Sequence, residues 1–199
     1  LAQKCGFGMV LVHAGHGWML HQFFSPLTNT RKDKWGGPDV ENRARLLISI
    51  CDAIHKRCGE GFPIEVRISG SECYDGGFGI ENGIAVAKQL EGHCQLIHVS
   101  AGNHEVEEVF AVTHPSMFLE DGCNVKYAAE IKKHVKPPVA AIGALSDPAL
   151  MEEILASGQA DVVEMGREFM ADPDFPLKIR TGQEEKARKC LRCLSCFSS

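Results

Sequence analysis

Two histidines near the start of the chain have a type and spacing that suit catalysis. His13 and His16 stand three residues apart in the sequence HAGHG, at the end of the apolar run 9–13. An imidazole donates a compact hydrogen bond, so such a pair can polarise a substrate carbonyl or bind an anionic oxygen. The alternative is a pair of loop histidines that bond only to the backbone. Their place at the end of a predicted strand favours the functional interpretation.

Three cysteines near the end of the chain form the sharpest local motif. Cys190, Cys193 and Cys196 follow a C-x-x-C-x-x-C pattern. Three thiolates at this spacing suit an iron–sulfur cluster. Zinc is the alternative, although Cys₄ zinc sites usually have two separated cysteine pairs. Either metal needs a fourth ligand, which we expect outside this chain. A group of free thiols is the remaining possibility.

An alternation of apolar runs and helical patterns must position these residues. The runs are 9–13, 64–69, 96–102, 139–144 and 161–166, and the helical patterns begin near residues 41, 82, 123 and 148. Such alternation predicts an α/β fold with a parallel sheet covered by helices. A barrel of eight units needs about 250 residues, so five units fit the larger part of a TIM (β/α)8 barrel. A doubly wound sheet is the alternative, and the absence of a G-x-G-x-x-G turn counts weakly against it.

Both architectures gather ligands at the carboxyl ends of their strands. Arg67 lies inside the run IEVRIS, where a buried arginine is costly unless an acceptor pairs with it. That acceptor is either a carboxylate or a ligand whose carbonyl oxygens and ring nitrogens match the planar guanidinium. Glycine lets a backbone N–H approach a phosphate, and arginine adds a bidentate partner. The other candidates at strand ends are Ser100, Gly102, Gly143, Gly166 and Arg167.

Composition narrows the possible partners. The 199 residues carry a net charge of −5, and no basic stripe is present, so we expect no nucleic-acid partner. No apolar run approaches the ~20 residues that span a bilayer, so we expect no membrane partner. Nine cysteines, mostly scattered in apolar contexts, fit a reducing cytoplasm. The chain begins inside a helical pattern and ends just after the cysteine motif, so we expect a piece of a longer protein, cut at both ends.

Several motifs together resemble one family. The stretch HAGHGWMLHQFFSPLTNTRKDKWGG (13–37), followed by ENRAR, VRIS, HVSAG, AIGAL, MGREFMADPDFP and CLRCLSC, is similar to the old yellow enzyme family. The closest similarity is to its NADH:flavin oxidoreductase branch with an iron–sulfur cluster, which includes 2,4-dienoyl-CoA reductase, 2-enoate reductase and bile-acid-inducible oxidoreductases. The resemblance extends over essentially the whole chain.

The resemblance implies an FMN-binding (β/α)8 barrel. Residues 1–185 would be its C-terminal portion, from about strand four to strand eight, and 186–199 would begin an iron–sulfur segment. The histidine pair would hold the carbonyl oxygen of an activated alkene, and Arg67 would lie beside the flavin pyrimidine. Gly143, Gly166 and Arg167 would hold the FMN phosphate, and the three cysteines would be the first ligands of a [4Fe–4S] cluster. Electrons would come from NAD(P)H.

One departure from the family concerns the proton donor. Many members have tyrosine where this chain has Trp18, and an indole N–H is no practical acid at neutral pH. Tyr74, on the loop after the second predicted strand, or water would then serve instead.

The expected substrate is a small enone, enoate or enoyl-CoA, and a homo-oligomer is compatible with the sequence. An amine dehydrogenase of the same architecture and a noncatalytic barrel that binds phosphate or zinc are the alternatives. The isolated chain lacks the predicted strands one to three, so we expect it to be inactive by itself.

Overall fold

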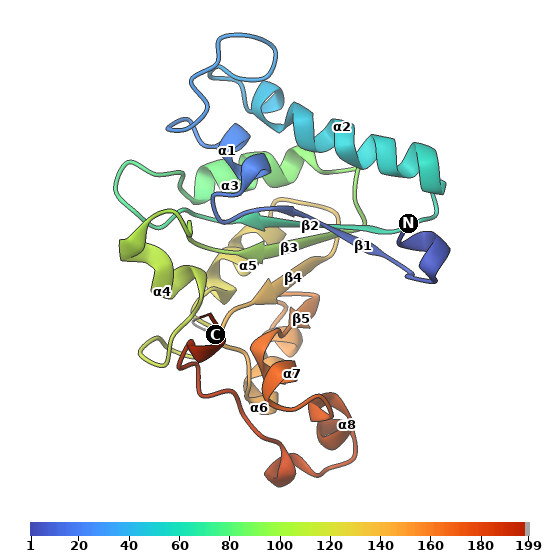
Figure 1. Ribbon diagram of the computed structural model, residues 1–199, viewed down its shortest axis with the longest axis vertical. Coiled ribbons are helices and arrows are strands. Elements are labelled where there is room, and N and C mark those ends of the chain that lie inside the picture. The colour runs from blue at the N-terminus through green and yellow to red at the C-terminus, as the bar shows by residue number, and fades with distance from the viewer. Residues whose placement is uncertain (198–199) are drawn as a thin grey trace.

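The computed structural model describes residues 1–197 and contains one parallel sheet of five strands (Figure 1). The strands are β1 (Val10–Ala14), β2 (Ile64–Ser69), β3 (Leu96–Ser100), β4 (Val139–Ile142) and β5 (Val162–Glu164). They pair in the order β1-β2-β3-β4-β5. A doubly wound sheet would reverse direction at a switch point, whereas this order runs without reversal, as in the wall of a barrel.

Helices connect successive strands. They are α1 (Met19–Phe24), α2 (Val40–Cys58), α3 (Ile80–Gln89), α4 (Phe110–Thr113), α5 (Val125–Lys132), α6 (Pro148–Ala156), α7 (Arg167–Ala171) and α8 (Phe175–Arg180). Short 3₁₀ helices span Gln3–Cys5, Glu107–Val109, Glu184–Lys186 and Ser195–Phe197. The sequence predicts α2, α3, α5 and α6. It does not predict α1, α4, α7 or α8, which have at most six residues and too few turns for a periodic pattern.

Two helices show how the sequence determines local structure. Helix α2 turns Leu47 and Cys51 fully inward, as the apolar spacing predicts, although Ile50 is only partly buried. Helix α6 begins as predicted, because the Asp147 carboxylate accepts a hydrogen bond from the backbone N–H of Ala149 at 3.2 Å and proline occupies the first turn. The buried face of α2 and the start of α6 therefore agree with the sequence-based prediction.

Strand β2 separates the two faces of the sheet. Ile64, Val66 and Ile68 are buried in the hydrophobic core that the helices cover. Because side chains alternate along a strand, Glu65, Arg67 and Ser69 point to the opposite face. This inner face carries polar groups, and it leads to the carboxyl ends of the strands.

The sheet has two edges, β1 and β5, each paired on one side only within residues 1–197. Apolar side chains are exposed on both, with Leu11 45% and Val162 37% accessible. Among the described residues, no helix is both long and apolar enough to cross a bilayer.

Candidate active site at the carboxyl ends of the strands

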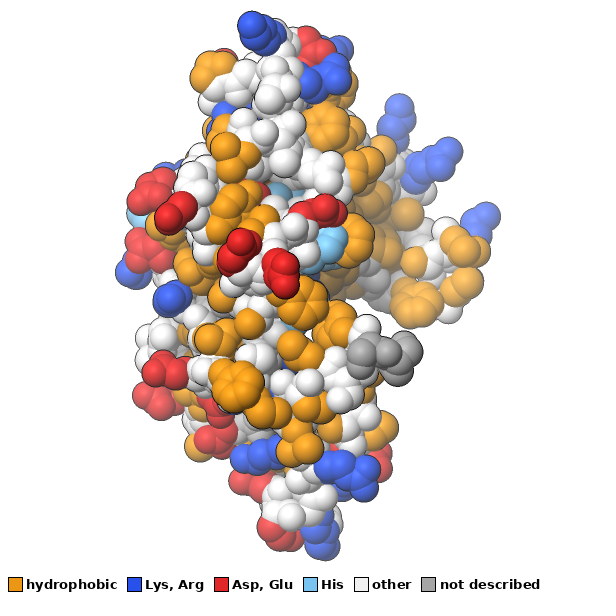
Figure 2. All heavy atoms as spheres, turned by 60° about the vertical axis from the view of Figure 1, so that its left-hand side comes forward, with side chains coloured by type: hydrophobic (Ala, Val, Ile, Leu, Met, Phe, Trp, Pro, Cys, Tyr) orange, Lys and Arg blue, Asp and Glu red, His pale blue; other side chains and the backbone are white. Residues whose placement is uncertain are grey.

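A cavity of about 280 Å³ opens at the carboxyl ends of the strands. It brings together eight of the predicted site residues, which come from all five strand ends: His13, His16, Trp18, Arg67, Ser100, Gly143, Gly166 and Arg167. Figure 2 shows the neighbouring surface, where histidine, acidic and hydrophobic side chains lie side by side. The parallel sheet therefore collects predicted residues from His13 to Arg167, far apart in the chain, into one site.

A line of hydrogen bonds fixes the His16 ring. The Nε2 atom of His16 lies 2.6 Å from the Ser100 hydroxyl, and Arg67 Nε donates to that hydroxyl over a longer 3.4 Å. The backbone N–H of His16 donates to the Ser69 hydroxyl at 2.9 Å. When Ser100 donates to Nε2, the ring hydrogen lies on Nδ1, where it can be donated to another acceptor.

His13 has a complementary arrangement. The backbone N–H of Gly15 donates to His13 Nδ1 at 3.4 Å, which leaves the ring hydrogen on Nε2. The His13 and His16 rings are nearly perpendicular, with centroids 5.1 Å apart. Two imidazole N–H donors therefore lie side by side at one wall of the cavity.

Burial and nearby charge keep these histidines neutral. Desolvation, followed by the positive charge of Arg67, lowers the pKa of His13 to about 4 and holds the pKa of His16 far below its ordinary value. Desolvation and the charge of Arg167 lower the pKa of His114 to about 4 as well. At neutral pH the imidazoles are thus uncharged hydrogen-bond donors, and the arginines carry the positive charge of the cavity.

Acid should destabilise the fold through these histidines. The unfolded chain protonates His13 and His114 near pH 6.5, whereas the folded chain does so near pH 4. The unfolded state therefore binds more protons within this window, and stability should fall as pH falls from about 6.5 to 4. Urea unfolding at pH 7 and pH 5 measures the loss. A His13→Asn, His114→Asn variant should lose less than the parent, and an equal loss in both proteins would contradict the shifted pKa values.

The phosphate-binding candidates present groups that lack protein partners. Arg167 Nη2 donates to the carbonyl of Pro115 at 2.8 Å, while its Nη1 is buried with no hydrogen-bond partner in residues 1–197. A Cβ atom built on Gly166 would meet no atom within 4 Å, so the space beside its backbone is open. Gly143 has a φ of +126°, a backbone conformation that favours glycine. The site therefore holds an unpaired cationic donor beside accessible backbone.

Two predicted residues, Tyr74 and Gly102, do not line the cavity, and a third, Trp18, lines it and stacks on another ring. Tyr74 is absent from the cavity and lines another hollow with Cys73 and Asp75, and burial and Glu72 raise its pKa. Gly102 does not line the cavity. Its φ is +89°, and a Cβ there would lie 2.2 Å from Thr113 Oγ1, so the glycine serves close packing instead. Trp18 lines the cavity and stacks on His104, with ring centroids 4.0 Å apart.

Sequence reasoning missed several cavity residues. They include His114, Asn124, Glu164 and Phe197. His114 follows α4 in a segment expected to be irregular, so no strand end indicated its position. Glu164 could have been found, because it ends β5 and strand ends gather at the site.

The three cysteines of the C-terminal motif line one cavity of about 450 Å³, which also touches Arg167. Arg192 and Leu194 have positive φ angles of 53° and 63°, so the backbone winds between the cysteines. The C-terminal segment returns toward the sheet in Figure 1 and is held there by Arg192, whose Nη2 lies 2.8 Å from Asp121 Oδ1. Arg167 thus borders both this thiol cavity and the cavity that the histidine pair lines.

The distances between the three cysteine sulfurs can be compared with those that a bound metal requires. In residues 1–197, the three sulfurs do not form a group with all atoms within 4.8 Å of one another. Tetrahedral zinc, with bonds of about 2.3 Å, needs thiolates roughly 3.8 Å apart. An iron–sulfur cluster has several metal ions, so its thiolates lie farther apart. The three sulfurs are therefore too far apart, in this arrangement, for one tetrahedral zinc ion to bind all of them.

Comparison with known proteins shows the family. Residues 1–186 match the sequence profile of the NADH:flavin oxidoreductase / NADH oxidase family. The chain is 40% identical over 193 residues to an NADH oxidase of Thermoanaerobacter brockii, covering 96% of this chain and 29% of that protein. It is 32% identical over 209 residues to a cinnamate reductase of Clostridium sporogenes, covering 97% of this chain and 31% of that protein.

A solved structure gives the same result for the fold. A 2-naphthoyl-CoA reductase in complex with 2-naphthoyl-CoA superposes with a TM-score of 0.88 at 32% identity, over 96% of this chain and 29% of that one. The chain therefore spans about a third or less of the length of these proteins. The sheet is part of an α/β barrel, as the alternation of strands and helices predicts. The chain belongs to the NADH:flavin oxidoreductase / NADH oxidase family.

Proposed function

We propose that the protein carrying this chain is an FMN-dependent oxidoreductase that uses NAD(P)H to reduce a C=C bond conjugated to a carbonyl. The observation that carries the proposal is the cavity itself, where two neutral histidines lie together with Arg67 and Arg167. The Nη1 of Arg167 is buried there without a hydrogen-bond partner in residues 1–197. The cinnamate reductase and the 2-naphthoyl-CoA reductase are named for substrates in which a carbonyl is conjugated to carbon–carbon double bonds.

The residues present fit FMN. The unpaired Nη1 of Arg167, the open backbone at Gly166 and the glycine conformation at Gly143 suit a phosphate. Arg67 lines the cavity, and its only hydrogen bond within residues 1–197 is the 3.4 Å contact from Nε to Ser100. Its terminal nitrogens can therefore donate to the carbonyl oxygens of a flavin ring. When bound, FMN would supply the two-electron donor and acceptor of the reaction.

The histidine pair would act on the substrate carbonyl. Reduction of a conjugated alkene places negative charge on the carbonyl oxygen. Nε2–H of His13 and Nδ1–H of His16 would donate hydrogen bonds to that oxygen and stabilise the charge. Because both pKa values lie well below 7, both rings stay neutral over the physiological pH range. Each ring therefore keeps one N–H donor and one acceptor nitrogen. Among residues 1–197, no tyrosine lines the cavity, so we propose that water protonates the α-carbon.

The cysteine motif would hold a [4Fe–4S] cluster with a fourth ligand from outside residues 1–197. Ser195 hydrogen bonds lower the pKa of the exposed Cys193 thiol, which favours the thiolate that ligates metal. Because Arg167 borders both cavities, the cluster would lie next to the flavin site, where it could exchange electrons with FMN.

Substrate specificity distinguishes this proposal from its alternatives. The protein, purified without oxygen, should oxidise NADH or NADPH when cinnamate or an enoyl-CoA is added, with formation of the saturated product. The protein should not oxidise a primary or tertiary amine, so an added electron acceptor should stay oxidised when an amine is the only donor. Amine oxidation without alkene reduction would instead establish an amine dehydrogenase, and neither activity in a zinc-containing protein would favour a noncatalytic barrel.

A further inference from the structure

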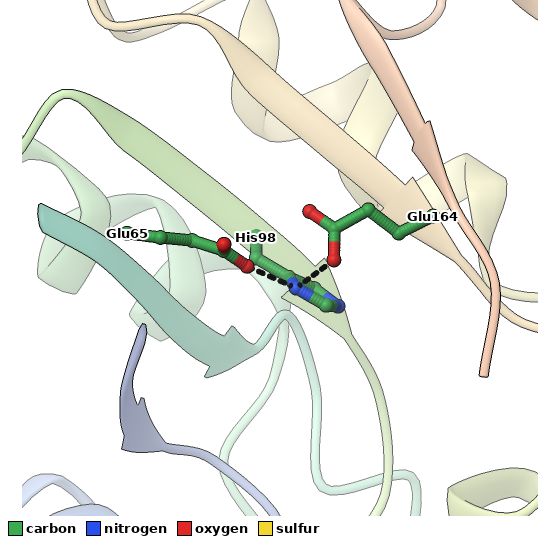
Figure 3. A group of neighbouring side chains, drawn as sticks. All are labelled: Glu65, His98 and Glu164. Carbon is green, nitrogen blue, oxygen red and sulfur yellow. Dashed lines mark hydrogen bonds and ion pairs between the residues drawn. The ribbon is translucent and has the colours of Figure 1, made fainter. Parts of the chain in front are cut away.

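A second group of polar side chains lies on the inner face of the sheet. Glu65 on β2, His98 on β3 and Glu164 on β5 converge there (Figure 3). Nδ1 of His98 is 2.7 Å from Glu65 Oε1 and 2.7 Å from Glu164 Oε2. His98 and Glu65 are buried, and the side chain of Glu164 is 24% exposed. Three strands therefore bring three metal-binding side chains to one point.

Hydrogen bonds within residues 1–197 leave part of this group without a partner. A single hydrogen on Nδ1 can point at one carboxylate oxygen, yet two oxygens lie at the same distance from that nitrogen. The second oxygen of Glu164, Oε1, is buried and has no hydrogen-bond partner in residues 1–197. Glu65 also interacts with Glu164 through a side-chain hydrogen bond. That bond requires a shared proton, because two carboxylates that close together repel each other unless a positive charge lies between them.

We propose that Glu65, His98 and Glu164 bind a divalent transition-metal cation inside the barrel. One donor atom from each residue lies within 4.8 Å of the others, so one ion can contact all three. Adjacent ligands of an octahedral ion with bonds of about 2.1 Å are roughly 3 Å apart. His98 Nδ1 therefore needs to move only a few tenths of an ångström away from each carboxylate oxygen. Oε1 of Glu164 would be available as a further ligand.

The surrounding charge supports a cation of charge two. Two carboxylates and a neutral imidazole sum to −2, and Arg67 interacts with both carboxylates through its charge. With Arg67 included, the group sums to −1, and a divalent ion brings it to +1. This charge lies beside the cavity that the histidine pair lines, where it would attract an anion. Glu164 lines that cavity and gives the ion a route of entry.

The ligand types point to Mn²⁺ as the best probe. Carboxylates suit Mn²⁺, whereas the chain's nine cysteines would compete for Zn²⁺. This inference does not depend on the proposed flavin chemistry, because none of its three residues has a role in the proposed binding of flavin or substrate.

The test is a Mn²⁺ titration of the protein carrying this chain, dialysed against EDTA and followed by electron paramagnetic resonance. One Mn²⁺ should bind per chain, with nitrogen coupling from one imidazole in electron spin-echo spectra. Glu164→Gln, which keeps the side-chain shape, should weaken binding at least about tenfold. His98→Gln should remove the nitrogen coupling.

Two controls separate this site from other metal ligands. Asp52→Asn removes a carboxylate that lies 2.6 Å from His93 Nδ1 at the surface, and it should leave Mn²⁺ affinity unchanged. Changing Cys190, Cys193 and Cys196 to serine should also leave it unchanged. The proposal would be overturned if the cysteine variant bound neither Mn²⁺ nor Zn²⁺ stoichiometrically, or if the spectrum of the parent protein showed no nitrogen coupling. Glu65, His98 and Glu164 would then be a hydrogen-bonded cluster without a metal.

Discussion

Replacing His16 with alanine should lower kcat/KM for the reduction of a conjugated enoate by about 10²–10³-fold, the usual cost of one donor to a developing oxyanion. The His16 ring is buried, neutral and fixed by the Ser100 hydroxyl at 2.6 Å, so its hydrogen bond is preorganised. Steady-state kinetics with cinnamate or an enoyl-CoA measures the effect. The rate of NADH oxidation with a carbonyl-free electron acceptor should change little, because that reaction places no charge on a carbonyl.

The control for this prediction is a histidine outside the cavity. His134→Ala changes an exposed ring that contacts Glu130, and it should leave both rates at the parent value. His13→Ala should resemble His16→Ala. Equal loss of both activities in the His16 variant would mean that the ring supports the fold or the cofactor, and an unchanged enoate rate would remove the oxyanion role.

Replacing Arg167 with alanine should weaken FMN binding by about 10- to 100-fold, as expected when a hydrogen bond from a charged group is lost. Its Nη1 is buried without a protein partner, and its Nη2 holds the carbonyl of Pro115 at 2.8 Å. A phosphate would complete the guanidinium's hydrogen bonding. Fluorescence titration of the deflavinated protein with FMN measures the dissociation constant.

Riboflavin provides a second test of the Arg167 prediction, because it has the flavin ring without the phosphate. Arg167→Ala should not change riboflavin affinity if the arginine acts on the phosphate. Arg180→Ala, an exposed arginine at the end of α8, is the matched control and should leave FMN affinity unchanged. An equal loss of FMN and riboflavin affinity would assign Arg167 a structural role instead.

The sequence predicts the long elements of this fold and fails on the short ones. The alternation of apolar runs and the amphipathic face of α2 are strong signals because they extend over several turns or a whole strand. Helix α7 has five residues, begins with Arg167 and follows a strand by only two residues, so no periodic pattern marks it. The position of α7 depends on packing against the rest of the barrel, and such packing cannot be predicted from the local sequence.

The residues of the candidate site are likewise only partly predictable from the sequence. His13 and Arg67 were found because a polar residue in or after an apolar strand is unusual and strand ends gather in space. His114 and the bond from Ser100 to His16 were not found, because they depend on how segments 84 or more residues apart meet. Tyr74 combines a phenolic side chain with a place on the loop after the second strand, yet the loop geometry puts it in a different hollow.

The most direct test of the central claim is the cofactor content of the protein carrying this chain, purified without oxygen. Its absorption spectrum, flavin, iron and acid-labile sulfide should be measured together. We predict one FMN per chain and about four iron with matching sulfide, the content of one [4Fe–4S] cluster. Flavin without iron would keep the flavin site and remove the cluster from Cys190, Cys193 and Cys196. A protein with neither flavin nor iron would contradict the proposed oxidoreductase.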